Sequence, residues 1–163
     1  MNPDKLLREH LISLLNGGNA SMPFSEAVAD FPTKFMNTTF PNGIYSPWDL
    51  LEHIRITQWD ILEFIKNPNY KEIKWPNDYW PPKNRKATKK EWEHTIELFQ
   101  NDLKEVQNIA KNSKTDLYAK IPHGTGQTIL RELLVVADHN AYHLGEFTIM
   151  RQVMKTWSKK HKE

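Results

Sequence analysis

The sequence predicts an all-α fold, a four-helix bundle with one short extra helix, on the strength of three observations. Four long segments repeat apolar residues at helical spacing. Two of these segments open on sequences typical of helix starts, and turn-forming sequences separate them. No segment shows the alternation of a strand, a βαβ unit or a phosphate-binding glycine loop. Amphipathic helices of this kind bury their apolar faces by packing into a bundle.

The first helix is predicted over residues 3–15, where leucines line one side and charged residues the other. Gly17 and Gly18 supply its end. A short helix follows over residues 25–31 and is broken by Pro32. The next sequence, residues 40–43 (Phe-Pro-Asn-Gly), is typical of a turn.

The second main helix has the best-defined start, at Ser46. Serine is a good N-cap, Pro47 suits the first turn, and Asp49 three residues on can close a capping box. The apolar stripe continues to about Lys66, after which Asn-Pro at 67–68 ends the helix. This helix carries His53 at the edge of its stripe, near the end at which the helix begins.

An aromatic and proline-rich loop is predicted between the second and third main helices. Residues 75–82 read Trp-Pro-Asn-Asp-Tyr-Trp-Pro-Pro, too rich in proline for a helix or central strand. They are also too aromatic for a plain solvated linker. We expect packing to order this loop, either on the outside of the bundle or as an active-site cover.

The third main helix is predicted from Thr88, which forms a second capping-box pattern with Glu91, to about residue 112. The fourth runs from near Thr128 to near Trp157, after a turn at residues 122–126. That turn contains His123, which either hangs over a site at this end of the bundle or is simply solvated.

The bulk composition bounds the function classes. A chain of 163 residues is most simply one domain, here residues 1–163, and a net charge of +2 is too small to indicate a nucleic-acid partner. No apolar run is long enough to span a membrane, and the charged N-terminus lacks the apolar core of a secretory signal, so we expect a cytoplasmic protein. The absence of cysteine excludes disulfides, thiolate metal ligands and a cysteine nucleophile.

A metal site is the chemistry that the histidines favour. His139 and His143 are four residues apart in the fourth helix and therefore lie on one face of it. His53 is a third candidate from another buried helix. Three neutral imidazoles with an open position are the ligand set of a catalytic zinc site. The alternative is structural, since acids in the same helices could satisfy buried histidines: Asp60, Glu132, Asp138 and Glu146.

Four segments closely resemble the DinB-like (DinB/YfiT) superfamily. Two of them carry the histidines, residues 46–62 (beginning Ser-Pro-Trp-Asp-Leu-Leu-Glu-His) and residues 136–145 (Val-Ala-Asp-His-Asn-Ala-Tyr-His-Leu-Gly). The others are the loop at 75–82 and residues 24–32. The resemblance extends from the end of the first helix to about Arg151.

This resemblance implies an up-up-down-down-type bundle, commonly a homodimer, that holds a divalent metal, usually zinc or nickel. The implied ligands are His53, His139 and His143. One departure is that residues 19–21, Asn-Ala-Ser, stand where relatives often carry histidine before the short helix. Three acids are the candidates for orienting the imidazole N–H groups: Asp60, Glu132 and, more weakly because it points about 100° away from its neighbour His139, Asp138.

The resemblance also implies a metal-dependent transferase that joins a low-molecular-weight thiol to an electrophilic small molecule. A three-histidine site suits this chemistry because the cation acidifies a bound water or thiol. Two alternatives stay open. One is a metal-dependent hydrolase, and the other is a non-catalytic metal-binding or dimerisation module, for which apolar residues away from the main stripe of the fourth helix would serve: Val135, Ile149 and Val153. Imidazole ligands alone suit zinc, nickel, copper or iron.

Overall fold

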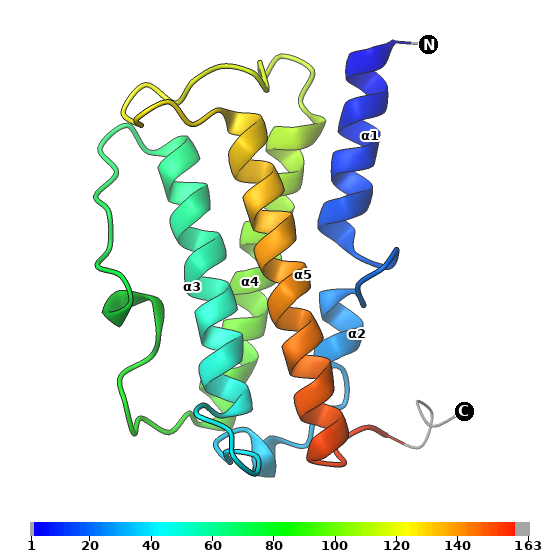
Figure 1. The fold of residues 1–163 in the computed structure, drawn as a ribbon, viewed down its shortest axis with the longest axis vertical. Coiled ribbons are helices and arrows are strands. Elements are labelled where there is room, and N and C mark those ends of the chain that lie inside the picture. Colours follow the sequence, from blue (N-terminus) through cyan, green and yellow to red (C-terminus); the bar gives the residue numbers. More distant parts are fainter. Residues whose placement is uncertain (1, 159–163) are drawn as a thin grey trace.

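The protein is described by a computed structural model over residues 2–158, and it is built from helices (Figure 1). Five α-helices and two 3₁₀ turns follow one another: α1 Pro3–Asn16, α2 Phe24–Val28, η1 Thr33–Phe35, α3 Pro47–Lys66, η2 Asn77–Tyr79, α4 Lys89–Lys111 and α5 Ile129–Val153. Within these residues the β structure is limited to one isolated bridge between Lys120 and Thr128. The predicted all-α bundle with one short extra helix is therefore confirmed.

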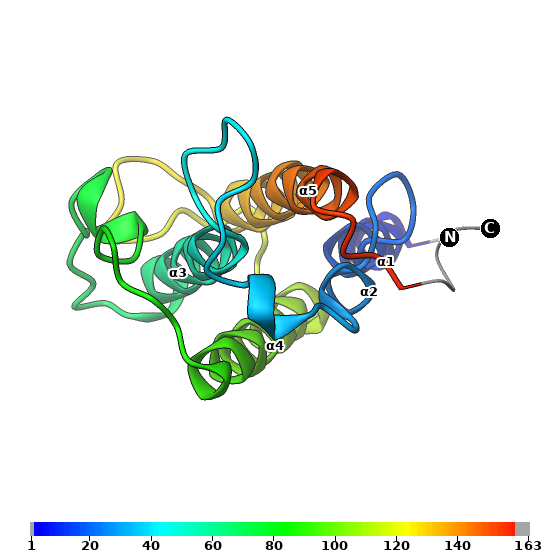
Figure 2. The ribbon, with the colours of Figure 1, turned by 90° about the horizontal axis from the view of Figure 1, so that it is seen from below.

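Helices α3 and α1 lie diagonally opposite each other, because each packs against both α4 and α5 (Figure 2). Helices α1 and α5 run in one direction and α3 and α4 in the other (Figure 1). Three interhelix contacts advance in the same order along α3 and α4, which shows that this pair is parallel: Glu52 with Thr95, Gln58 with Phe99, and Lys66 with Glu105.

The expected up-up-down-down order is therefore wrong, since the order along the chain is down-up-up-down. The physical reason is the long connection over residues 67–88, which runs back along the bundle and lets α4 start at the same end as α3 (Figure 1). The connections before α3 and after α4 each join two antiparallel helices that lie diagonally opposite in the bundle, α1 with α3 and α4 with α5 (Figure 2).

The start of α3 is fixed by the capping box that the sequence predicts. The Asp49 backbone N–H donates to Ser46 Oγ at 3.2 Å, and the Ser46 N–H donates to Asp49 Oδ2 at 2.8 Å. These bonds satisfy backbone donors that an open helix end would leave unpaired. They also set the register of α3, which places His53 on its buried face.

Helix α4 begins with the second predicted capping box. Glu91 accepts from the Thr88 backbone N–H at 2.7 Å, and Arg85 also donates to it. These donors, the Thr88 N–H first, lower the pKa of Glu91 from 4.5 to about 2. The carboxylate form is thus favoured by the folded state.

We expect Glu91→Gln to remove a pH-dependent part of the stability. The folded-state pKa of Glu91 lies below 4.5, so its contribution is present above pH 4.5 and disappears as pH falls through about 2. The variant should be less stable than the parent at neutral pH and approach it in acid. Urea unfolding across this pH range measures the difference. Glu93→Gln, at an exposed glutamate paired with Lys89 outside the cap, is the control, and identical acid profiles for both variants would contradict the assignment.

Two of the predicted helices end earlier than expected, each beside a residue with left-handed backbone. Helix α2 stops at Val28, ahead of Asp30 at φ 51°, and α5 stops at Val153, ahead of Lys155 at φ 55°. Arg151 joins the two ends. Its guanidinium is fully buried and donates to the carbonyls of Ala27, Ala29 and Thr156 at 2.6, 2.8 and 3.1 Å.

None of the helices within residues 2–158 is long and apolar enough to cross a membrane. The cytoplasmic location stays a prediction.

Candidate metal centre

The three predicted histidines meet at one point between α3 and α5. Nε2 of His53 lies 3.3 Å from Nε2 of His143 and 3.3 Å from Nε2 of His139. One ring nitrogen from each residue falls within 4.8 Å of the other two, so the group could hold a metal ion. That it does so stays a prediction.

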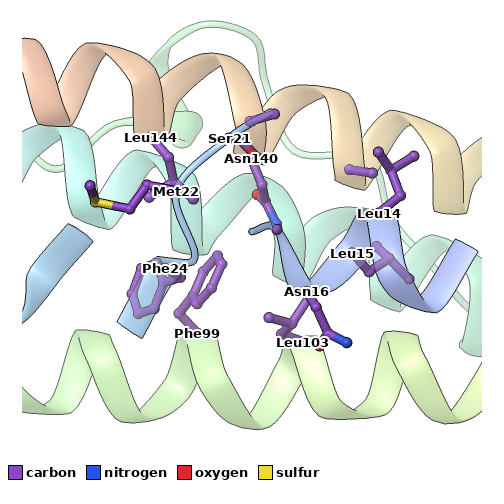
Figure 3. A pocket seen from close by; sticks show the side chains of 13 residues that line it. Leu14, Leu15, Asn16, Ser21, Met22, Phe24, Phe99, Leu103, Asn140 and Leu144 are labelled. Carbon is purple, nitrogen blue, oxygen red and sulfur yellow. The ribbon is translucent and has the colours of Figure 1, made fainter. Parts of the chain in front are cut away.

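Buried hydrogen bonds between polar side chains fix the rotation of α5 relative to α3 next to the three histidines. Asn140, next to His139 in the chain, donates to Gln58 Oε1 at 2.9 Å, and Gln58 donates to the Phe99 carbonyl at 2.8 Å. Figure 3 shows Asn140 reaching inward from α5 above the stacked rings of Phe24 and Phe99, beside a small cavity. These buried bonds join α3, α4 and α5 and hold the rotation of α5 that turns its histidines toward α3.

Hydrogen bonds fix which nitrogen faces the centre in two of the rings. His53 Nδ1 lies 2.8 Å from the Tyr79 carbonyl, and His143 Nδ1 lies 2.7 Å from Glu146 Oε2. A carbonyl and a carboxylate only accept, so both Nδ1 atoms carry the hydrogen, and in the neutral rings the Nε2 lone pairs point to the centre. His139 Nδ1 is buried and lacks a hydrogen-bond partner among the described residues.

Burial keeps two of the rings in the form that binds metal. Desolvation lowers the pKa of His53, which is 2 % exposed. Desolvation, with the neighbouring His143 and His53, lowers the pKa of His139 to about 3. Both rings are therefore neutral at physiological pH, as metal coordination requires.

The donor set and its spacing fit a small divalent cation. Nitrogen ligands roughly 2.0–2.1 Å from a tetrahedral zinc ion lie about 3.3 Å from each other. The two Nε2 distances from His53 are both 3.3 Å. Nε2 lone pairs 3.3 Å apart repel each other unless a cation or a proton lies between them. A single proton can bridge His53 to His139 or to His143, but not to both. The residues present thus fit a metal ion held by three imidazoles.

The aromatic loop covers one side of the centre. The Trp80 ring stacks on His53, with centroids 4.0 Å apart and planes within 2°. The preceding residue, Tyr79, supplies the carbonyl that holds His53, while its hydroxyl donates to Asp60 Oδ2 at 2.6 Å. Of the two interpretations of this loop, the contacts favour the cover. Asp60 accepts hydrogen bonds from Tyr70 and Tyr79 and makes none with the three histidines among the described residues, so its link to His53 runs through Tyr79.

Glu146 is the acid that orients an imidazole directly. From the sequence, Glu146 is predicted only as one of four acids that could satisfy a buried histidine. Its position three residues after His143 places both side chains on one face of the helix, and this spacing is the signal for a direct contact. Tyr45, which sequence reasoning misses, lies beside it. Burial, followed by the charge of Glu146, raises the pKa of Tyr45 to about 12, so its hydroxyl stays protonated at neutral pH.

The other candidates lie elsewhere. Glu132 is buried and pairs with Arg131 at 2.6 Å in a separate polar pocket near the end of α3, and His123 lies in that pocket 2.8 Å from the Phe64 carbonyl. Asp138 is exposed and makes no hydrogen bond to the three histidines among the described residues. The prediction that Glu132 and Asp138 orient the imidazoles is therefore not supported by any contact.

We expect Glu146→Gln to weaken metal binding by about 10- to 100-fold, the usual cost of losing an acceptor behind a ligating histidine. The amide keeps the shape but removes the charge that stabilises the His143 N–H. Competition with a chromophoric chelator measures the affinity. Asp138→Asn removes an equal charge from the same helix without touching a histidine, and equal affinity losses in both variants would refute the role of Glu146.

Residues 20–147 match the family model described as the DinB superfamily. The matched span includes His53, His139, His143 and Glu146, and the match confirms the resemblance that the sequence predicts. No curated protein matches the chain, and no solved structure matches it.

Proposed function

We propose that this chain, which belongs to the DinB superfamily, is a metal-dependent enzyme that transfers a low-molecular-weight thiol to an electrophilic small molecule. The metal, zinc or nickel, would be held by His53, His139 and His143. One observation carries the proposal, the meeting of three Nε2 atoms from α3 and α5. A divalent cation with three imidazole ligands supplies Lewis acidity at its remaining position, which favours the anionic form of a thiol.

The surrounding residues hold and shield this centre. The Tyr79 carbonyl and the Glu146 carboxylate keep two rings turned so that Nε2 faces inward. Trp80 excludes water from the side of His53 that it covers. The neutral Tyr45 hydroxyl is a hydrogen-bond donor to Glu146 and helps to hold the carboxylate that orients His143.

The sulfur must come from a second substrate, since the chain contains no cysteine. In the transfer, the thiol sulfur forms a bond to the electrophilic carbon and the leaving group departs with the electron pair of the bond that breaks. The thiol proton passes to solvent. The protein therefore has to bind two small molecules and position them for this displacement.

The test is turnover by the metal-loaded protein with cysteine or glutathione as the thiol and chlorodinitrobenzene as the electrophile, followed by thioether absorbance. We expect a rate that depends on both metal and thiol and is lost in His143→Ala. Loss of the electrophile without thiol consumption would instead favour hydrolysis. A protein that binds metal but stays silent with every thiol and electrophile would be a binding module, against the proposal.

We also propose that two copies associate through the exposed side of α5. Four large apolar residues are at least 44 % exposed along this helix: Leu134, Tyr142, Ile149 and Val153. Val135, expected on the same surface, packs partly into the core instead. A small-molecule substrate and no nucleic acid remain our expectation for the other partners, and light scattering reports the mass of the assembly.

A further inference from the structure

A further cavity lies at the end of the bundle where α3 and α4 begin, which is the lower end of the ribbon in Figure 1. Its walls are the chain before α3 and the chain before α4, and its volume is about 610 Å³. Small-molecule sites commonly have volumes of about 300–1,000 Å³. Asn37 ties the walls together, because its side chain donates to the Ala87 carbonyl at 2.8 Å and accepts from the Ala87 N–H at 2.8 Å. The cavity is thus held open by the fold itself.

The charge of this cavity is positive. Lys83, Arg85 and Lys86 line it, against the single acid Asp49. Asp49 is occupied by the helix cap, where the Ser46 N–H and hydroxyl both donate to it, and Arg85 is paired with Glu91. Lys83 and Lys86 form no ion pair with any residue of the described chain. The ammonium groups of Lys83 and Lys86 are therefore available to bind an anion.

Part of the remaining wall is apolar. Ile44 is 90 % exposed at the cavity, and the rings of Tyr45 and Trp80 form its inner side, with centroids 5.2 Å apart. An exposed isoleucine beside two aromatic rings gains from covering by an apolar group. An apolar part of the wall and the two lysines in the same cavity fit a molecule that has an aromatic or aliphatic body and a carboxylate or another anionic group.

The two inner rings also touch the histidine centre. Trp80 stacks on His53 at 4.0 Å, and Tyr45 lies beside Glu146, which holds His143. We propose that this cavity binds a small amphiphilic anion, and that such anions are the electrophilic substrates of the transferase. The second part rests on the proposed function, while the first depends only on the cavity.

The test of binding uses three probes of one shape and different charge: benzoate, benzamide and benzamidine. Binding is followed by the indole N–H NMR signal of Trp80, assigned with Trp80→Phe. We expect saturable binding of benzoate, weaker binding of benzamide and the weakest of benzamidine. Lys83→Gln with Lys86→Gln should weaken benzoate binding about fivefold, the size expected for two exposed ion pairs. Equal affinities for benzoate and benzamide would overturn the proposal.

The matched control is Lys89→Gln with Lys90→Gln, which removes the same charge at the start of α4 outside the cavity lining. It should change benzoate affinity by less than about twofold. If both double variants lose affinity equally, binding follows net charge alone and the cavity assignment falls.

A kinetic arm separates the two proposals. With metal and thiol present, chloronitrobenzoate should show a lower KM than chloronitrobenzamide, and the Lys83 and Lys86 double variant should raise only the KM of the acid. If the protein bound benzoate but took up no metal, the proposed metal-dependent transferase would be refuted and the proposed anion-binding cavity would be supported. If thiol transfer showed the same KM for the acid and the amide, the proposal of an anionic substrate would be refuted and the proposed transferase activity would be supported.

Discussion

His143→Ala is expected to abolish stoichiometric metal binding. His143 supplies one of the three Nε2 atoms, and the two imidazoles that remain are a poor site for a divalent cation. The affinity loss should exceed the roughly 10- to 100-fold cost of disturbing a residue behind a ligand. Metal analysis of protein purified without an affinity tag, after dialysis against zinc or nickel, measures the change.

The control for this experiment is His94→Ala, at an exposed histidine of α4 that lies 3.8 Å from Glu97. It removes an imidazole from the surface and should leave the metal content unchanged. If His143→Ala and the parent carried the same amount of metal, the ligand assignment would be wrong and the histidines would be structural. Unfolding midpoints measured alongside show whether the variant keeps its fold.

Arg151→Met is expected to cause the largest loss of stability, about 3–5 kcal/mol, the range for removing one partner from a buried charged network. Methionine fills much of the space but leaves the carbonyls of Ala27, Ala29 and Thr156 without their donor, and the bonds to Ala27 and Thr156 are buried. It also removes the guanidinium that packs 3.8 Å from the Trp157 ring centroid. Urea unfolding at neutral pH gives the free energy.

Arg55→Met is the matched substitution for comparison. Arg55 donates to Glu52 at 2.7 Å but keeps 16 % of its side chain exposed, and such pairs contribute up to about 1 kcal/mol. A loss at Arg151 as small as the loss at Arg55 would mean that water replaces the guanidinium. In that case the end of α5 is less tightly closed than its contacts indicate.

The parts of the fold that follow from short-range sequence were predictable. Ser46 with Asp49, and Thr88 with Glu91, form their caps within four residues, so no tertiary information is needed to find them. The same holds for His139 and His143, whose shared face follows from the helical period. The third candidate ligand, His53, needed the further expectation that its helix packs against theirs.

The parts that escaped prediction depend on long-range geometry or on the backbone. The direction of α4 is decided by the course of residues 67–88, in which no single residue signals a return along the bundle. The Tyr79 carbonyl that holds His53 is a backbone atom, which residue type cannot reveal. Arg151 reaches carbonyls more than 120 residues away along the chain, so its sequence context marked it only as a charged residue near a helix end.

The adjacency of Tyr79 and Trp80 couples entry to the centre with the alignment of its ligand. One peptide unit carries both the acceptor for His53 and the ring that shields it. A bulky substrate that displaced the Trp80 indole would also shift the adjoining Tyr79 carbonyl. The hydrogen bond from the Tyr79 hydroxyl to Asp60 opposes that shift. A substrate that enters by displacing the Trp80 ring would therefore also weaken the hydrogen bond that orients His53. A substrate that enters beside the indole edge would leave that hydrogen bond in place.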